Sequence, residues 1–298
     1  MHIVIDAHLA VKKIDGIARY LNGLLTELPG IDPSINYTIL SLPAEQSSLP
    51  EEIFAHSNVR RFEFNIMGPS PRQHLITGRL LKELKADVYH HPQYDLPIGV
   101  RVPAVITIHD LKYIFHAEFL RDKSRLKRFY IKNILRRSLK VANHVIAVSE
   151  STLTDLRKIL SFNLDKASVI YHGMNAPISI PEKSEFKSIN SFDISKKFIL
   201  FVGTRRPHKN IEGLIRALAI LRNEYNHDID LVIAGKAYSD YNVPERYAQQ
   251  IKAERHTHFI DFVPDNMLPE FYAKAEVVAL ISFYEGFGLP LLEAMAYG

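Results

Sequence analysis

The sequence contains no cysteine, which excludes disulfide bonds and metal sites built on thiolates. No apolar run approaches the ~20 residues that a membrane-spanning helix needs. Repeats and low-complexity tracts are absent, and a formal net charge of +4 is too small to indicate nucleic-acid binding. The first residues, 1–6, have the pattern of a strand rather than of a signal peptide. These absences predict a cytoplasmic globular protein with no nucleic-acid partner.

The 298 residues are 47% hydrophobic and 23% charged, which suits two α/β domains. Short β-branched apolar runs alternate with longer helical patterns, as in parallel sheets covered by helices. In the first half, the predicted strands are 2–7, 37–42, 59–64, 87–91, 104–109, 144–148 and 168–171. The predicted helices between them are 17–28, 72–84, 122–141 and 151–160. We therefore assign residues 1–176 to a first domain.

A stretch rich in Ser, Pro, Lys and Glu follows, and we interpret 177–196 as a linker. A second domain, 197–298, has predicted strands 198–202, 231–234, 258–262 and 277–281, and helices 211–223, 245–254, 267–274 and one that begins near Pro290. A complete doubly wound domain usually has six strands, so we expect this domain to be incomplete, with one bare edge on its fourth strand. Two such domains predict a cleft for a small molecule.

The last motif, Glu285-Gly-Phe-Gly-Leu-Pro290, joins an apolar strand to a helix that carries Glu293. Gly286 and Gly288 let the backbone approach a ligand closely, and the start of the helix offers free N–H groups to phosphate or sugar hydroxyls. The two glutamates can accept hydrogen bonds from hydroxyl groups. Two glutamates at this spacing alone would favour an ordinary turn, but the full motif favours a ligand site.

A second candidate site begins where strand 198–202 ends. Arg205, Arg206 and Lys209 lie between that strand and the next helix, and three cations beside a helix N-terminus suit a diphosphate. The alternative is a solvated basic turn. Its position favours the ligand site, because ligands of open α/β sheets bind at the carboxyl ends of strands.

With these motifs the chain resembles the family 4 retaining glycosyltransferases, whose GT-B fold has two Rossmann-like domains facing across a cleft. The resemblance covers nearly the whole chain and is carried by residues 203–210, 234–235, 259–264 and 285–293, with 107–110, 148–150 and 171–173. It implies hexosyl transfer from a GDP-, UDP- or dTDP-sugar to a glycan or lipid-linked acceptor, without a metal or other cofactor. The setting that it implies is bacterial envelope polysaccharide synthesis, such as O-antigen or capsule.

The resemblance also implies roles for residues. Lys209, with Arg205 or Arg206, would neutralise the leaving diphosphate; many members have Arg at the position of His208, so the cationic partner of Lys209 stays open. Glu293 would hold the ribose, Glu285 the sugar, and His109 would face that sugar across the cleft. His109, Lys209 and Glu285 are thus the predicted catalytic residues. The other implied donor contacts are Gly203, Gly286, Phe287, Gly288 and Leu289, and those on the acceptor or phosphate side are Gly16, Arg19 and Tyr20. No enzyme nucleophile is implied.

Three other motifs are weaker evidence of function. Asp228-Ile-Asp230 matches a metal-binding string, but it precedes its strand, which favours a solvated loop. The pairs His90-His91 and His256-Thr-His258 have no third ligand nearby in sequence, which favours a role without a metal. Gly286-Phe-Gly288 lacks the third glycine of a dinucleotide fingerprint, which argues against a dehydrogenase.

Residues 121–140 contain nine Lys or Arg and one acid. The interpretation that we favour is a surface helix with one face on the core. The alternative is a membrane-surface helix, Lys123–Lys140, that brings the protein to anionic lipid and a lipid-linked acceptor.

Two other functions stay open at this stage. A sugar-nucleotide epimerase on the same fold would need no acceptor, and the products would reveal it. A non-catalytic remnant would bind a partner or a glycan through the first domain and would leave nucleoside diphosphates unbound.

Overall fold

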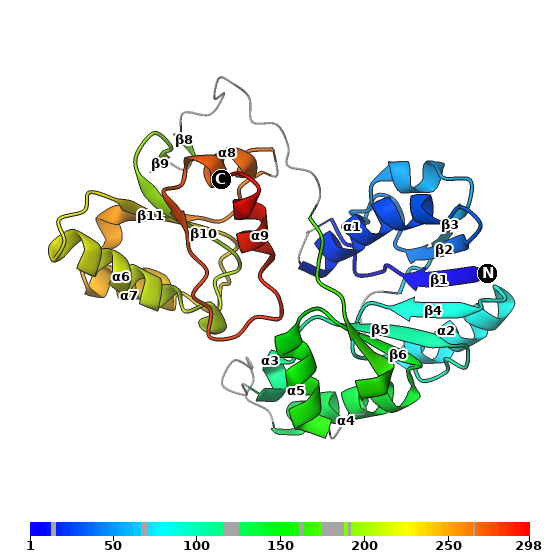
Figure 1. The fold of residues 1–298 in the computed structure, drawn as a ribbon. Coiled ribbons are helices and arrows are strands. Elements are labelled where there is room, and N and C mark those ends of the chain that lie inside the picture. The colour runs from blue at the N-terminus through cyan, green and yellow to red at the C-terminus, as the bar shows by residue number, and fades with distance from the viewer. Residues whose placement is uncertain are drawn as a thin grey trace. The chain divides into compact units, whose positions relative to one another are not determined.

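The computed structural model describes residues 1–12, 16–66, 71–115, 125–160, 164–174, 188–189, 192–264 and 266–298. The chain divides into two compact units, Met1–Gly173 and Met174–Gly298 (Figure 1). Each unit is built around a parallel sheet and is described by itself. Within the described residues, none of the helices is long and apolar enough to cross a bilayer.

The first unit has a seven-stranded parallel sheet in the order β3-β2-β1-β4-β5-β6-β7. Its strands are β1 (His2–Asp6), β2 (Asn36–Ser41), β3 (Val59–Glu63), β4 (Val88–His91), β5 (Ala104–Ile108), β6 (His144–Ala147) and β7 (Ala167–Val169). All seven predicted strands are present, with ends within two residues of the prediction. Strands β1 to β3 are added towards one edge of the sheet, and β4 to β7 are added towards the other edge. The strand order therefore switches between β1 and β4, which are neighbours in the sheet.

Helices cover both faces of this sheet. They are α1 (Gly16–Ile31), α2 (Pro71–Glu83), α3 (Lys112–Phe115), α4 (Arg125–Val141) and α5 (Glu150–Leu160), with 3-10 turns η1 (Glu51–Ala55) and η3 (Leu164–Lys166). Leu21 and Leu25 of α1 pack with Ile5 and Ile39 in one core. The opposite core receives α2, α4 and α5, because strand side chains alternate between faces. Residues 122–124 of the predicted helix 122–141 lie outside the described residues.

The second unit has a four-stranded parallel sheet in the order β12-β11-β10-β13. Its strands are β10 (Phe198–Val202), β11 (Asp230–Ala234), β12 (Thr257–Ile260) and β13 (Val277–Val278). Its helices are α6 (Ile211–Asn223), α7 (Val243–Gln250), α8 (Leu268–Lys274) and α9 (Leu289–Met295), with 3-10 turns η4 (Pro207–Lys209) and η5 (Glu254–His256). Helices α6 and α7 pack on one face of the sheet, and α8 and α9 pack on the other.

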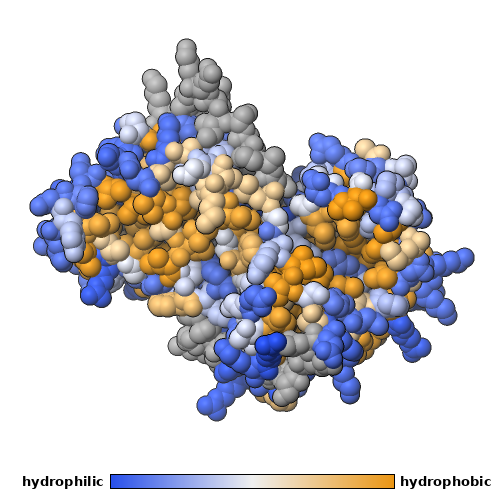
Figure 2. Space-filling model, in the orientation of Figure 1, coloured by the Kyte–Doolittle hydropathy of each residue, from blue (hydrophilic) through white to orange (hydrophobic). Residues whose placement is uncertain are grey.

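Two elements of this unit end well before the predicted residue. The helix predicted over 245–254 ends at Gln250, because Lys252 takes a left-handed conformation with φ of 60°. The strand predicted over 277–281 pairs only at Val277 and Val278, and β13 is an edge strand of the described sheet, as expected. Val277 and Phe283 are exposed, and Figure 2 shows hydrophobic side chains gathered on the second unit where this segment runs.

The predicted linker 177–196 lies largely outside the described residues. Its last part is not a linker: β8 (Ser188–Ile189) and β9 (Phe192–Asp193) form a short antiparallel pair. Phe192 and Ile194 are buried in the core of the second unit, where Phe192 meets Phe198 edge to face at 5.4 Å. The surrounding stretch is mostly polar and its few apolar residues show no sustained periodicity, so the sequence did not indicate this packing.

Candidate active site

The basic turn and the glycine corner of the second unit lie side by side. Lys209 of η4 forms an ion pair with Glu285, and Ser282 Oγ donates to the same carboxylate oxygen at 2.5 Å. The backbone N–H of Phe283 donates to the His208 carbonyl at 2.8 Å. The Asn210 amide donates to the Ile281 carbonyl at 3.2 Å. Two segments more than 70 residues apart in sequence therefore meet at the carboxyl end of the sheet, where the ligand was predicted.

Glycine is required at two positions beside this corner. A Cβ on Gly235 would lie 1.9 Å from the Gly203 carbonyl oxygen, so only glycine lets the loops after β10 and β11 pack this closely. Gly288 has φ of 110° and immediately precedes α9. Gly286, Phe287 and Leu289 complete the same corner, with the Gly286 position buried.

Arg205 does not fit the predicted role of diphosphate ligand. The residue is only 3% exposed, and its guanidinium forms ion pairs with Glu245 and Asp261 and donates to the Gly235 carbonyl at 3.1 Å. Its charge is therefore already compensated inside the unit. Sequence could not distinguish it from Arg206, since both partners lie at least 40 residues away.

Arg206 is the more accessible arginine of the turn. Its guanidinium carbon lies 3.4 Å from the ring centroid of Tyr238, and Nη1 lies 3.7 Å from Asp240. Stacking on an aromatic ring fixes the plane of the guanidinium without consuming its in-plane N–H groups. Tyr238 follows β11 in the loop after Gly235, and the sequence analysis missed it. The sequence could have indicated Tyr238, because it is an aromatic residue shortly after a strand that is followed by Gly235.

Glu293 lies on α9 and accepts a hydrogen bond from the Tyr272 hydroxyl at 2.6 Å. Tyr272 belongs to α8 and stacks on Tyr297 at 5.9 Å. These contacts hold the Glu293 carboxylate in place, which suits a group that must present an acceptor to a ribose. Its predicted contact with the ribose stays a prediction.

In the first unit, the predicted residues His109 and Tyr20 meet in a cluster at the carboxyl ends of β4, β5 and β7. The Tyr20 ring lies 4.9 Å from that of His109 and 5.2 Å from that of His172. The Tyr20 hydroxyl lies 3.1 Å from Thr107 Oγ1, which in turn lies 2.9 Å from His90 Nε2. Sequence analysis gave no role to Thr107, His90 or His172. Each lies near the carboxyl end of a predicted strand, and this position could have indicated a place in the site.

The imidazole of His109 is neutral and its tautomer is defined. Burial, with a smaller contribution from the neighbouring His172, lowers the pKa of His109 to about 3. Its ring hydrogen bond goes to the Pro92 carbonyl, whereas Nε2 is buried and has no hydrogen-bond partner in the described part of the chain. The proton is therefore on Nδ1, and Nε2 offers a lone pair.

The other predicted residues on this side are Gly16 and Arg19. Gly16 is the first residue of α1, and no described atom lies within 4 Å of the point where a Cβ would stand. Arg19 is half-buried on the same helix. The predicted contact of these residues with an acceptor or a phosphate is not tested by the geometry of this helix.

A separate buried network joins the ends of β1 and β4. Asp6 Oδ2 accepts a hydrogen bond from the Tyr89 hydroxyl at 2.6 Å and lies 3.3 Å from His91 Nδ1, and Asp6 Oδ1 pairs with His8. Burial disfavours the charged form of His91, but hydrogen bonds to Asp6 and Asp95 outweigh it and raise the pKa of His91 to about 9. This imidazolium between two carboxylates links the ends of β1 and β4.

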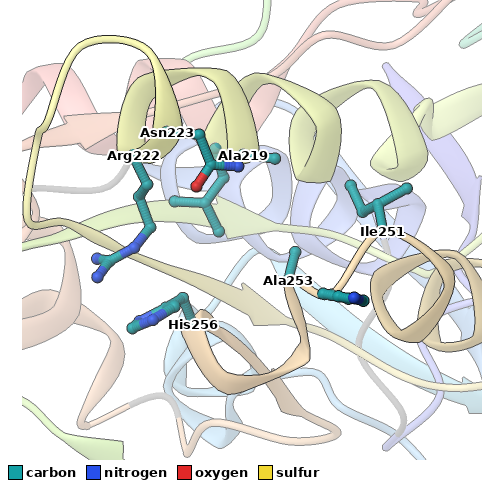
Figure 3. Close-up of a pocket in the computed structure, with 8 residues that line it drawn as sticks. Ala219, Arg222, Asn223, Ile251, Ala253 and His256 are labelled. Atoms are coloured by element: carbon teal, nitrogen blue, oxygen red, sulfur yellow. The ribbon is translucent and has the colours of Figure 1, made fainter.

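The surface pocket in Figure 3 lies at the opposite, amino-terminal edge of the second sheet. It measures about 280 Å³, and Arg222 from the end of α6 faces His256 across it. Asp228 lies 3.0 Å from Arg222, and Asp230 accepts from His256 at 2.9 Å and from His258 at 2.8 Å. Asp228 is exposed in the loop before β11, as predicted, whereas the predicted solvated position is wrong for Asp230, which is the first residue of β11 and is buried. Both acids lie within ion-pair distance of Arg222. Across the described ranges, no group of three or more His, Cys, Asp or Glu is placed to hold a metal.

The two Rossmann-like units define the GT-B fold, and comparisons with solved structures agree. The chain is similar to sucrose-phosphate synthase from Thermosynechococcus elongatus with a TM-score of 0.69 and 17% identity, over 100% of this chain and 79% of that one. It is also similar to HepE from Anabaena, solved in complex with UDP-glucose, with a TM-score of 0.67 and 20% identity, over 100% and 78% of the two chains.

Family models match both units. Residues 14–176 match the model described as Glycosyltransferase Family 4, and residues 182–298 match that described as Glycosyl transferases group 1. The chain therefore belongs to glycosyltransferase family 4. One relative is an O-antigen chain mannosyltransferase B of Escherichia coli, 29% identical over 220 residues, or 73% of this chain and 57% of that protein. The chain spans about half the length of the curated relatives that it matches.

Proposed function

We propose that the protein is a retaining glycosyltransferase of bacterial envelope polysaccharide synthesis. It moves a hexose from a nucleotide sugar to a glycan or lipid-linked acceptor, without a metal ion. The observation that carries the proposal is the Lys209–Glu285 ion pair, which brings a cation and the glycine corner together. The O-antigen mannosyltransferase relative supports mannose as the hexose, and HepE with UDP-glucose supports a nucleotide-sugar donor.

The charges of this corner fit a diphosphate leaving group. The ammonium of Lys209 has three N–H donors, and Glu285 accepts one of them. The remaining donors and the Arg206 guanidinium neutralise charge that develops on the diphosphate as the glycosidic bond breaks. Glu285 orients Lys209 and accepts from a sugar hydroxyl, and the backbone amides of 286–289 and Gly203 line the same corner. Glu293 holds the ribose.

Transfer with retention needs no enzyme nucleophile in this arrangement. The departing phosphate oxygen accepts the proton of the attacking hydroxyl on the same face of the sugar, and the protein orients both substrates. Nε2 of His109 accepts a hydrogen bond from a hydroxyl of the bound sugar, since it is a neutral acceptor. Gly16 and Arg19 contribute to the acceptor side.

A donor panel tests this function. The protein is incubated with GDP-mannose, UDP-glucose and dTDP-glucose, with and without a lipid-linked glycan acceptor, and the products are separated by chromatography. The expected result is release of nucleoside diphosphate with a larger acceptor. An altered sugar released without acceptor would identify an epimerase. A folded protein that neither turns over nor binds any of the donors would identify a binding module.

We further propose that α4 contacts anionic membrane, which would bring the enzyme to a lipid-linked acceptor. Leu126, Phe129 and Tyr130 are 81%, 68% and 60% exposed on the solvent-facing side of the helix, and Arg136 and Lys140 are exposed further along it. Residues 123 and 124 of the predicted basic segment lie outside the described residues. Exposed aromatic and aliphatic side chains beside cations are typical of helices that lie in a bilayer interface.

The segment between β4 and β5 also carries an exposed apolar side chain. Arg137 of α4 donates to the Leu96 carbonyl at 2.6 Å, and the Ile98 N–H donates to His74 of α2 at 3.3 Å. The segment between β4 and β5 therefore bridges α4 and α2, and it carries the exposed Ile98 beside the exposed Leu75.

Vesicle co-sedimentation tests the membrane contact. We expect more protein to pellet with anionic than with neutral vesicles, and we expect Phe129→Ser with Tyr130→Ser to abolish the difference. A matched control replaces Tyr225, which is also exposed but lies in the second unit, with Ser. Equal pelleting with both lipids would exclude this contact while leaving the transferase proposal in place.

A further inference from the structure

Tyr20 is fixed at both ends of its side chain. Its ring meets His109 at 73° and His172 at 62°, and the two imidazoles stack on each other at 5.5 Å and 11°. Its hydroxyl lies 3.1 Å from Thr107 Oγ1 and 3.4 Å from His90 Nε2. The pKa of Tyr20 is raised to about 12 by burial, so the hydroxyl keeps its proton. Tyr20 can donate to Thr107, and Thr107 can donate to His90.

This packing limits how His109 can turn. A ring flip would exchange Nδ1 with a carbon and break the bond to the Pro92 carbonyl. The Tyr20 ring packs against the imidazole at a steep angle, and the His172 ring lies nearly parallel to it. Nε2 is therefore kept as the acceptor, with its direction set by neighbours from three elements.

We infer that Tyr20 is a positioning residue, which holds His109 so that Nε2 presents its lone pair to a hydroxyl of the bound sugar. The substrate part of this inference rests on the proposed function, whereas the positioning concerns the free protein. It replaces the role on the acceptor or phosphate side that the sequence gave to Tyr20, because an uncharged cluster suits a neutral hydroxyl better than a phosphate.

The groups around His109 favour a neutral ring over the physiological range. They are Tyr20 from α1, His90 from β4, Asp110 after β5 and His172 after β7. Burial lowers the pKa of His90 and of His172 to about 4. Asp110 and the hydrogen bond to Pro92 favour the imidazolium, and burial of His109 outweighs them. The acceptor lone pair therefore persists when the pH changes.

Nitrogen NMR of the histidine rings tests the positioning in the 298-residue chain. The His109 signals are identified by their loss in His109→Gln. We expect one protonated and one unprotonated ring nitrogen, with no titration between about pH 5 and pH 8. In Tyr20→Ala, we expect tautomer exchange and titration within that range. Tyr37→Phe, a buried tyrosine on β2, is the matched control and should leave His109 unchanged. Unaltered His109 signals in Tyr20→Ala would overturn the inference.

Milder variants keep the test valid if Tyr20→Ala does not fold. Tyr20→Phe removes the hydrogen bond between the Tyr20 hydroxyl and Thr107, and Thr107→Val removes it together with the bond between Thr107 and His90, so each should shift the His109 signals. No shift in either variant would contradict the inference. If activity is found, Tyr20→Ala should lower transfer about 100-fold through misplacement of His109. A protein without transferase activity whose His109 still responds to Tyr20→Ala would contradict the proposed function and support the positioning role.

Discussion

The two units carry their candidate groups in opposite electrostatic states. In the first unit, His90, His109 and His172 surround Tyr20 with lowered pKa values, so the cluster is uncharged. In the second unit, Lys209 pairs with Glu285, and Arg206 stacks on Tyr238. The sheets are alike in being parallel, and both sets of groups lie at carboxyl ends of strands. This difference fits the proposed function, in which the second unit binds a charged diphosphate and the first unit binds neutral hydroxyl groups.

The largest effect that we expect is the loss of transfer activity in the variant Lys209→Met. Removing the cation takes away stabilisation of the leaving diphosphate, and we expect the transfer rate at saturating donor to fall about 100- to 1000-fold. Lys252→Met at the opposite edge of the sheet is the matched control. Equal initial rates for the Lys209 variant and the wild type would remove this corner from the mechanism.

Arg205→Met should separate folding from chemistry in the second unit. It leaves Glu245 and Asp261 without their buried cation, and we expect a loss of about 3 kcal/mol of stability, at the lower end of such effects because Asp261 is exposed. Chemical unfolding measures it, with the exposed Arg216→Met on α6 as the control. A stable variant that loses donor binding instead would restore Arg205 to the predicted diphosphate site.

As the pH falls, we expect the first unit to lose stability before the second unit, whose ion pairs depend on carboxylates. The folded pKa values of His90 and His109, about 4 and about 3, lie below the ordinary 6.5. The unfolded chain therefore binds more protons, and stability falls by about 1.4 kcal/mol per pH unit for each histidine between about pH 6.5 and pH 4. His91, with a pKa raised to about 9, contributes fully throughout that window.

Hydrogen exchange of peptides from β5 measures this acid effect, and His109→Gln should reduce the slope. Protection of β5 that stays constant from neutral pH down to about pH 4 would contradict the assignment of these histidines as neutral in the folded state.

The smallest expected effect is that of Asp230→Asn, which tests the opposite edge of the second sheet. The change weakens hydrogen bonds from His256 and His258, and we expect a loss of about 1 kcal/mol of stability with transfer unchanged. Thermal unfolding and the transfer assay measure the two quantities. A large fall in transfer would place function at this edge as well.

Most of the fold could be predicted because apolar strands and amphipathic helices leave strong local patterns. All eleven strands of the two parallel sheets were expected near their observed positions. The misses have physical causes: Lys252 ends α7 by a left-handed backbone that residue type did not indicate. The short β8–β9 pair depends on burial of Phe192, which only tertiary packing decides.

The candidate site was predictable in its position and less so in its contacts. The rule that ligands bind at carboxyl ends of strands indicated the basic turn that contains Lys209, and the resemblance to family 4 implied the roles of Lys209, Glu285 and His109. It could not distinguish Arg205 from Arg206, because burial and pairing depend on acids distant in sequence. Likewise, Tyr20 came from α1 into a cluster with residues that belong to three strands or their ends, which no local pattern contains.

Calorimetry of nucleoside diphosphates tests the central claim most directly, because it needs neither the sugar nor the acceptor. The wild-type chain is titrated with GDP, UDP and dTDP, alongside Lys209→Met and Lys252→Met. We predict that at least one diphosphate binds, that Lys209→Met weakens its binding at least about tenfold, and that Lys252→Met leaves it unchanged. Identical affinities for the wild type and Lys209→Met, or no binding of any diphosphate to a folded wild-type chain, would contradict the account.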